Sequence, residues 1–474
     1  MRFFNFYTLN CKLKLYGHFE LPKWISRGID SIKLLNIRCS EIAKNNEWEY
    51  NLKSFRILSV VTALIAASNT MAQQTLINAD AYVDVKKGKV VKNIAILIDG
   101  NKIIQVGKQG KVKTNQDAKI VNLKGKTLVP GLMDMHVHLS SDAEDNFLAA
   151  RGNSVPRQTV KAVKNAKKTL MAGFTTVRNL GASGYSIIGV RDGINAGEVS
   201  GPRIWAAGHS ISITGGHCDD NFSPPEAKST AGGVADGPWA VRAKVRENIK
   251  YGANTIKVCA TGGVFSKGTK VGIQQLTEEE MKAAVDEAHL RGLIAAAHAH
   301  GTSGIKAAIR AGIDSIEHCS FLDDEAIELA LKHGTYMSCD IYNTEYTLAF
   351  GAENGVPEEN INKEKLVSKA QRESFRKATK AGVNMVFGSD AAIYPHGDNG
   401  KQFSRMVTYG MTPMQALQAA TISSATLLQQ QDSLGQIKAG FLADIVAVDG
   451  NPIKNISTME NVSFVMKDGV IYKQ

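Results

Sequence analysis

The chain has 474 residues, of which 43% are hydrophobic and 21% charged, and this composition is typical of a folded globular protein rather than a disordered one. The formal net charge of +11 suggests nucleic-acid binding, but ten basic and five acidic residues within 1–72 supply +5 of it. Because the remaining charge is spread along predicted helix faces and no basic-aromatic motif accompanies it, we expect no nucleic-acid partner.

The N-terminal region has the layout of a targeting segment. Lys53 and Arg56 precede the short apolar run 57–67, and small residues follow in the sequence 70–72. A basic, an apolar and a small-residue region in this order are typical of a signal peptide, and the apolar run is too short to span a bilayer. We therefore expect export, to the periplasm or outside the cell, with cleavage near Ala72 and no stable membrane insertion afterwards.

Residues 1–51 stand upstream of this signal, where an exported chain is expected to begin. In the interpretation that we favour, translation starts near Leu52 and the upstream segment is not made. In the alternative, the segment is a cytoplasmic tail and the apolar run is an uncleaved anchor. Both interpretations separate residues 1–72, as an upstream segment plus signal peptide, from the predicted fold.

Both ends of the remaining chain have the pattern of short strands joined by tight turns. Strands are predicted at 81–85, 94–98, 102–106, 444–448, 462–466 and 470–472. Asp99-Gly100 between two apolar runs is a hairpin signal. The sequence therefore predicts that residues 73–130 and 433–474 together build one small β-sandwich.

The middle of the chain, residues 131–432, alternates between helices and short apolar strands. The capping box Thr277-x-x-Glu280 marks the start of one helix, and Arg291-Gly292 marks its end. Helices are predicted at 159–171, 238–251, 277–291, 304–311, 323–332 and 364–381, and strands at 175–177, 255–259, 293–297, 315–318, 335–338 and 384–387. When the strand before His136 is included, the number of strand–helix units is close to eight. We therefore expect the α/β fold class and a closed (β/α)8 TIM-type barrel.

Side chains able to bind a metal stand at the carboxyl ends of the predicted strands, where barrel enzymes place their active sites. His136 and His138 lie two residues apart, and they point the same way because side chains alternate along a strand. Four further strands end on one such residue each, namely Lys257, His298, His318 and Asp390. A single histidine at a strand end is ordinary, but six such groups at one edge of a sheet predict a metal site.

The order His-x-His, Lys, His, His, Asp resembles the amidohydrolase superfamily, and the resemblance runs from about Thr75 to the C-terminus. The stretches 214–217, 256–264, 297–301 and 315–318 are similar to the imidazolonepropionase-like group that contains Xaa-Pro dipeptidases (prolidases) and ochratoxinases. The resemblance implies hydrolysis of a C–N amide bond, in a dipeptide-like substrate of the Xaa-Pro type or in an N-acyl amino acid.

The resemblance also implies two divalent metal ions, expected to be Zn²⁺. The ligands would be His136, His138 and Asp390 for one ion and His298 and His318 for the other, with Lys257 bridging both. Lys257 would be an N6-carboxylysine, because a carbamate formed with CO2 supplies two oxygens where an ammonium would repel metals. A hydroxide between the ions would attack the amide carbon, and Asp390 would pass its proton to the leaving amine.

Three more histidines and an arginine have predicted roles. His300, two residues beyond His298, is a candidate for catalytic and substrate contact, with a supporting role for His298 as an equal alternative. His217 in the sequence Thr-Gly-Gly-His and His396 after the last strand are candidate substrate contacts. For Arg178 we favour pairing with a barrel carboxylate over binding an anion.

The four cysteines after the signal are Cys218, Cys259, Cys319 and Cys339. They form no CxxC pair and no spacing typical of a disulfide scaffold. We therefore expect them to be small buried side chains without disulfides.

Two other functions stay open. One is a mononuclear imidazolonepropionase-like or deaminase-like hydrolase of a cyclic amide or amidine, against which Lys257 argues. The other is a non-catalytic metal-binding scaffold, against which the complete ligand set argues. The expected partner is a small molecule or dipeptide, and the sequence leaves a homo-oligomer open.

Overall fold

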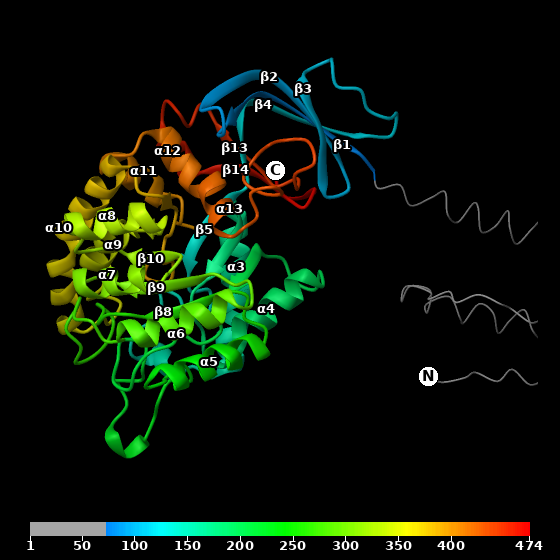
Figure 1. The fold of residues 1–474 in the computed structure, drawn as a ribbon. Helices are drawn as coiled ribbons and strands as arrows, with labels where there is room; N and C mark the ends of the chain where they lie inside the picture. Colours follow the sequence, from blue (N-terminus) through cyan, green and yellow to red (C-terminus); the bar gives the residue numbers. More distant parts are fainter. Residues whose placement is uncertain (1–72) are drawn as a thin grey trace, which may run out of the picture. The chain divides into compact units, whose positions relative to one another are not determined.

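The computed structural model describes residues 73–474, so the predicted signal peptide and the segment before it lie outside the described residues. Within 73–474 no helix combines the length and apolar character needed to cross a membrane. Figure 1 shows a β-sheet made from both ends of this region and an α/β part between them.

Strands from both ends of the described chain build the first sheet. They are β1 (Thr75–Asp84), β2 (Lys89–Asp99), β3 (Lys102–Lys108), β4 (Lys119–Pro130), β13 (Ile445–Asp449), β14 (Val462–Lys467) and β15 (Val470–Lys473). Their order is β15-β14-β13-β4-β1-β2-β3, and β1 and β4 are parallel whereas the other neighbours are antiparallel. The prediction that strands from both ends of this region come together is therefore confirmed. The strands form one seven-stranded sheet, and the two-layer sandwich and the domain limits stay predictions.

The predicted hairpin at Asp99-Gly100 joins β2 to β3. Ile98 pairs with Ile103 across the turn, and Gly100 has a φ of 55°. Glycine adopts this left-handed conformation without the steric cost that a Cβ imposes. The turn thereby sets the register that places Ile98 and Ile103 in the buried core of the sheet.

The middle of the chain contains two parallel sheets. One consists of β5 (Leu132–Val137), β6 (Phe174–Asn179) and β7 (Arg203–Ala206). The other consists of β8 (Ile256–Cys259), β9 (Ala295–Ala299), β10 (Ser315–His318), β11 (Tyr336–Ser338) and β12 (Met385–Val386). Single parallel bridges, Val137 with Ala391 and Ile211 with Val258, lie between the two sheets. The predicted α/β alternation is confirmed, and continuous closure into a barrel stays a prediction.

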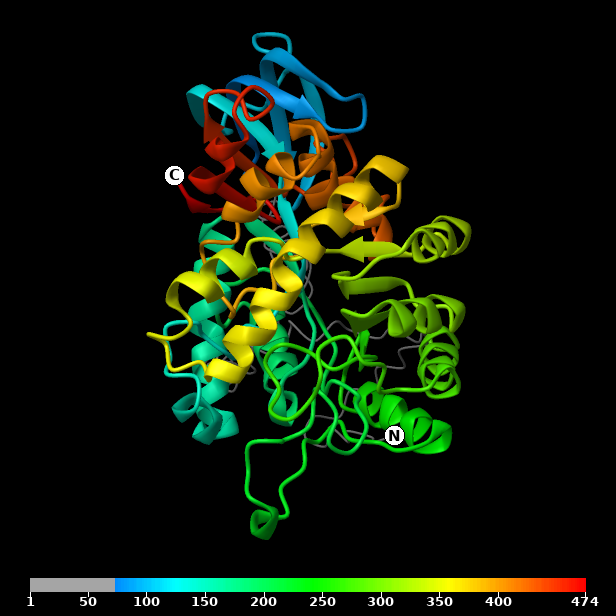
Figure 2. The ribbon, with the colours of Figure 1, turned by 90° about the vertical axis from the view of Figure 1, so that its left-hand side faces the viewer.

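Helices lie on the outside of these strands, as the two views agree (Figure 1, Figure 2). They are α3 (Val155–Met171), α4 (Ser186–Asn195), α5 (Pro238–Lys250), α6 (Glu278–His289), α7 (Thr302–Arg310), α8 (Asp324–His333), α9 (Asn343–Phe350), α10 (Glu358–Ala381), α11 (Lys401–Thr408), α12 (Pro413–Gln418) and α13 (Ser424–Leu427). The Thr277 capping box is present at the start of α6. The start of α3 lies earlier than predicted, because Pro156 fits the first turn, where no intrahelical partner for its missing N–H is needed.

The register of the parallel strands brings their carboxyl ends to one edge. His298 of β9 pairs with Cys259 of β8 on one side and with Glu317 of β10 on the other. Chemically active side chains that are far apart in the sequence therefore meet at this edge, as expected for α/β sheets of this kind.

Arg203 connects β7 to the C-terminal strands. Its guanidinium lies 3.0 Å from Asp444 Oδ2 and 2.6 Å from Asp468 Oδ1. Asp444 also accepts a hydrogen bond from the backbone N–H of Asp468 at 2.9 Å. These contacts tie the sheet from the chain ends to the α/β part.

Candidate metal centre

A cavity of about 240 Å³ lies at the carboxyl ends of the parallel strands. All six predicted metal ligands line it, namely His136, His138, Lys257, His298, His318 and Asp390. His138 and Phe265 also line a neighbouring cavity of about 710 Å³, so the two spaces adjoin. The structure therefore brings the predicted cluster together in one place.

Three of these side chains converge on one point. His136 Nε2 lies 3.3 Å from His138 Nε2, and Asp390 Oδ1 lies 3.4 Å from the first and 3.5 Å from the second. Ligand atoms around a tetrahedral Zn²⁺ are separated by about 3.3 Å at the usual bond lengths. The donor set of His136, His138 and Asp390 thus fits a metal ion of this size.

A second group of donors adjoins the first. Ligand atoms of His298, His300 and His318 lie within 4.8 Å of one another, and so do those of His318, Asp340 and Asp390. His298 Nε2 is buried and has no hydrogen-bond partner among the described residues. Because a buried polar nitrogen without a partner is costly, the free Nε2 also fits a metal ligand.

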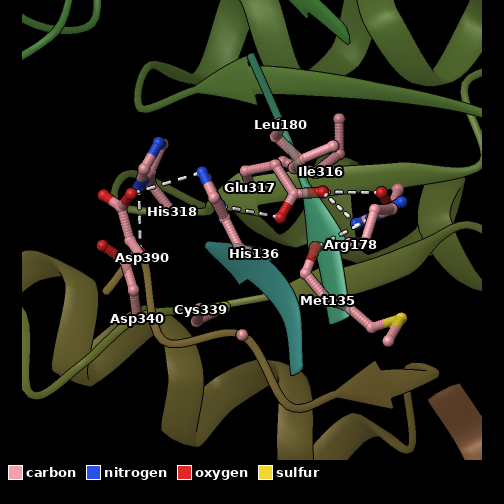
Figure 3. A network of polar contacts seen from close by, with 12 residues as sticks. Met135, His136, Arg178, Leu180, Ile316, Glu317, His318, Cys339, Asp340 and Asp390 are labelled. Carbon is pink, nitrogen blue, oxygen red and sulfur yellow. Dashed lines mark hydrogen bonds and ion pairs between the residues drawn. The ribbon is translucent and has the colours of Figure 1, made fainter. Parts of the chain in front are cut away.

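A buried ion pair orients His136 (Figure 3). Glu317 Oε2 lies 3.1 Å from His136 Nδ1, and Arg178 Nη2 lies 2.7 Å from Glu317 Oε1. Burial alone would raise the pKa of Glu317, but the Arg178 guanidinium and the His136 ring lower this pKa well below its usual range. With Nδ1 facing the Glu317 carboxylate, Nε2 is turned toward Asp390 and the cavity. The predicted carboxylate partner of Arg178 is confirmed.

His318 is oriented by an equivalent contact. Asp340 Oδ1 lies 2.9 Å from His318 Nδ1 and accepts a hydrogen bond from Gln371 Nε2 at 3.2 Å. Burial lowers the pKa of His318, but the Asp340 and Asp390 carboxylates together raise it more, so the net shift is upward. Sequence reasoning missed Glu317 and Asp340, although Glu317 precedes His318 and Asp340 stands two residues after β11, another strand-end position.

Asp390 occupies a constrained position. Its backbone N–H donates to the His136 carbonyl at 2.7 Å, and its Oδ2 accepts a hydrogen bond from Asn343 Nδ2 at 3.2 Å. Burial raises the pKa of Asp390 to about 7. Asp390 and His318 have φ values of 53° and 73°, and such left-handed conformations outside glycine concentrate at functional sites.

Lys257 of β8 is 3% exposed and lines the same cavity. Burial lowers the pKa of Lys257 to about 8, because the charged ammonium loses its hydration. A larger fraction of neutral amine is therefore present near neutral pH than for a lysine on the surface.

His217 and His300 also lie at the cavity. The His217 ring stacks on that of His298 with centroids 4.0 Å apart, and His217 Nδ1 lies 2.9 Å from Ser266 Oγ. A Cβ at Gly263 would collide with both stacked rings, so this close approach requires glycine. His300 Nδ1 lies 2.7 Å from Ser320 Oγ.

His396 is not brought to the cavity. It is 3% exposed, and its Nε2 lies 3.1 Å from the Ser141 carbonyl while its Nδ1 lies 3.5 Å from Thr169 Oγ1. It lines neither the 240 Å³ nor the 710 Å³ cavity. The ring thus makes polar contacts that connect α3 with two loops, and its predicted contact with the substrate stays a prediction.

Two of the four cysteines within residues 73–474 are paired, which corrects the prediction of free thiols. Cys218 and Cys259 form a disulfide with Cα atoms 6.3 Å apart, whereas Cys319 and Cys339 are free and buried as expected. The disulfide ties the loop that carries His217 to the end of β8. The partners are 41 residues apart, and the folding of this loop over β8 has no signature in their spacing.

Replacing Arg178 with methionine should lower the free energy of unfolding by about 3–5 kcal/mol, because it leaves a buried carboxylate without its cation. Both Arg178 and Glu317 are fully buried, at 0% exposure. The matched control is Arg310→Met, which removes a pair with Glu278 whose side chains are 44% and 40% exposed, and should cost less than about 1 kcal/mol. Chemical denaturation measures both changes, and equal losses would contradict the role given to the buried pair.

Parallel strands alternating with helices, and a cluster of histidines and carboxylates at the strand ends, define an α/β enzyme with a candidate metal centre. The sequence profile described as "Amidohydrolase family" matches residues 127–472. This chain therefore belongs to the amidohydrolase family, whose superfamily members are hydrolases of C–N amide bonds and typically use metal ions.

Individual relatives agree with this assignment. An ochratoxinase of Aspergillus niger is 30% identical over 437 residues, which cover 86% of this chain and 89% of that protein. An imidazolonepropionase of Symbiobacterium thermophilum is 22% identical, over 82% of this chain and 91% of its own. The crystal structure of a Xaa-Pro dipeptidase with bound methionine in its active site is 42% identical, with a TM-score of 0.79 over 85% of this chain and 100% of that one. The fold is TIM-barrel-like, and the predicted family resemblance is confirmed.

Proposed function

We propose that the protein is a binuclear metal-dependent amidohydrolase that cleaves a C–N amide bond in a dipeptide-like or N-acyl amino acid substrate. The observation that carries the proposal is the convergence of the His136, His138 and Asp390 ligand atoms at 3.3–3.5 Å, next to the unpartnered His298 Nε2. The substrate would bind in the 240 Å³ cavity, which these residues line.

The donors present suit two divalent ions, which we expect to be Zn²⁺. His136, His138 and Asp390 would hold one ion, and His298 and His318 the other. Lys257 is a fitting bridge as its carbamate, because its lowered pKa favours the neutral amine that reacts with CO2. When bound, the ions would supply Lewis acidity that polarises the scissile carbonyl and lowers the pKa of a nearby water.

The protein groups would position the reactants and move the proton. Asp390 would take the proton of the attacking water and deliver it to the leaving nitrogen. Glu317 and Asp340 would keep the rings of His136 and His318 in the orientation that faces the cavity.

His217 and His300 are the proposed substrate contacts. Both line the cavity, and each has one ring nitrogen occupied by a serine hydroxyl, Ser266 Oγ for His217 and Ser320 Oγ for His300. The remaining nitrogen of each ring is available for the substrate carboxylate or the carbonyl oxygen. Hydrolysis of amides by relatives named ochratoxinase and Xaa-Pro dipeptidase, the latter with methionine in its active site, supports a substrate with an amino acid part.

A metal count combined with a substrate screen tests the proposal. The purified zinc-loaded protein would be assayed with a library of Xaa-Pro dipeptides and N-acyl amino acids, and its metal content measured by atomic spectroscopy. We expect about two ions per chain and turnover that disappears when a chelator removes them. One ion with turnover of an imidazolone or amidine would support the mononuclear alternative, and bound metal without any turnover would support a binding scaffold.

We also infer export of the protein through the predicted signal peptide ending near Ala72. The disulfide between Cys218 and Cys259 supports this inference, because disulfides persist in oxidising compartments. Amino-terminal sequencing of the protein recovered from cell fractions tests it, with a mature start at Gln73 expected.

A further inference from the structure

Glu364 is a buried acid in the cavity wall to which the proposed chemistry gives no role. Glu364 lines the 240 Å³ cavity, and the residue is 4% exposed to solvent. Thr344 Oγ1 donates a hydrogen bond to Glu364 Oε1 at 2.8 Å. Among the described residues, no lysine, arginine or histidine lies within ion-pair distance of this carboxylate. The cavity wall therefore holds a buried carboxyl group to which the described residues supply no cation.

The position of Glu364 is fixed by the helix that carries it. Glu364, Val367 and Gln371 all line the cavity, and spacings of three and four residues place them on one face of α10. Gln371 Nε2 donates to the His318 carbonyl at 3.1 Å as well as to Asp340. This face is therefore held against the candidate metal centre, while Glu364 is not among the residues whose ligand atoms gather there.

The surroundings of Glu364 indicate what it would bind. Val264, Phe265, Val367 and Ile393 supply apolar wall to the same cavity. Among residues 73–474, Lys257 is the only lysine or arginine that lines it. Burial raises the pKa of Glu364 to about 7, because an ionised carboxylate without a counter-charge is costly in such a place. A ligand that brings its own cation and an apolar group would relieve this cost.

We propose that Glu364 binds a protonated amine of the substrate, so that the site selects amides whose acyl part carries an ammonium group beside an apolar side chain. This inference rests on the proposed function. It chooses aminoacyl amides, such as dipeptides, over N-acyl amino acids that lack the amine. In this arrangement Glu364 determines specificity and takes no part in proton transfer to the scissile bond.

A pair of matched substrates tests the proposal. Leucyl-proline carries the amine, and 4-methylpentanoyl-proline has the same shape without it. We expect the zinc-loaded wild-type protein to prefer leucyl-proline by at least about tenfold in kcat/KM, as a charge-assisted hydrogen bond allows. Glu364→Gln should lower kcat/KM for leucyl-proline by about 10- to 100-fold and change that for 4-methylpentanoyl-proline less than about threefold.

Two control variants separate recognition from structure. Glu373→Gln makes the same change on the same helix, at a side chain that is 53% exposed, and should leave both substrates unaffected. Thr344→Val removes the hydrogen bond to Glu364 but keeps its charge, and should retain the preference for the amine. If Thr344→Val reproduced the effect of Glu364→Gln, or if Glu364→Gln slowed both substrates equally, a purely structural role would replace the proposal.

The outcomes for the two proposals differ. Turnover of both substrates without preference would overturn the role of Glu364 and leave amide hydrolysis standing. If the protein turned over neither substrate, this would count against the proposed function. The role of Glu364 would then be tested by measuring ligand binding. Calorimetry would compare leucine with 4-methylpentanoate, and a preference for leucine that is lost in Glu364→Gln would support the ammonium site, whereas equal binding would overturn it.

Discussion

Replacing Asp390 with asparagine should lower kcat by about 10³-fold or more while the protein stays folded. The change removes the proposed proton carrier and weakens a donor that lies 3.4–3.5 Å from two histidine nitrogens. It adds little backbone strain, because asparagine tolerates the left-handed conformation that Asp390 has at a φ of 53°. Its amide oxygen can still accept the hydrogen bond from Asn343.

The matched control is Asp398→Asn, eight residues further along. Asp398 forms an ion pair with Lys401 at 2.8 Å in which both side chains are partly exposed, so its loss should leave kcat within about twofold and stability nearly unchanged. Circular dichroism and thermal unfolding would verify the fold of both variants, and atomic spectroscopy their metal content. Near-normal turnover of Asp390→Asn with metals retained would refute the proton-transfer role.

Replacing Lys257 with alanine should reduce the bound metal and lower turnover by more than about 100-fold, the upper end of the loss seen for residues that only support metal ligands. Lys257 is buried within the cluster, so the variant leaves a space beside the metal donors. If Lys257 acts as a carboxylate, a short carboxylic acid such as acetate or propionate should fill this space and restore part of the activity.

The rescue experiment distinguishes two forms of the lysine. Recovery of activity with propionate but not with propylamine would support the carbamate, whereas recovery with propylamine alone would show that Lys257 acts as an amine. Lys282→Ala is the control for a lysine outside the cluster, since its side chain is 61% exposed and pairs with Asp286. Full activity and metal content in Lys257→Ala would contradict the ligand assignment altogether.

Much of the fold could be predicted from local patterns. The capping box at Thr277, the hairpin at Asp99-Gly100 and the limits of β10 depend on residues that are neighbours in the sequence. The positions of His298 and His318 followed from the alternation of strands and helices, because parallel strands present their carboxyl ends at one edge. The six candidate ligands could be found in this way since each stands at, or within a few residues of, the end of a strand.

Other parts of the site had no local signal. Arg178 and Glu317 are 139 residues apart, and Cys218 and Cys259 are 41 residues apart. Their pairing depends on how two sheets and a long loop are placed in space. The contacts of His396 could not be predicted for the same reason. Its position after the last strand suggested the cavity, whereas its ring contacts Ser141 and Thr169.

The sequence by itself determined the family, the order of the elements and the residues at the strand ends, because periodicity, caps and motif order are properties of neighbouring residues. Only the tertiary structure decided which side chains orient the histidines, which cysteines pair and which further acid lines the cavity beside them. These contacts join elements that are distant in the chain, and their free energies depend on burial and geometry that exist only once the strands and helices have been packed together.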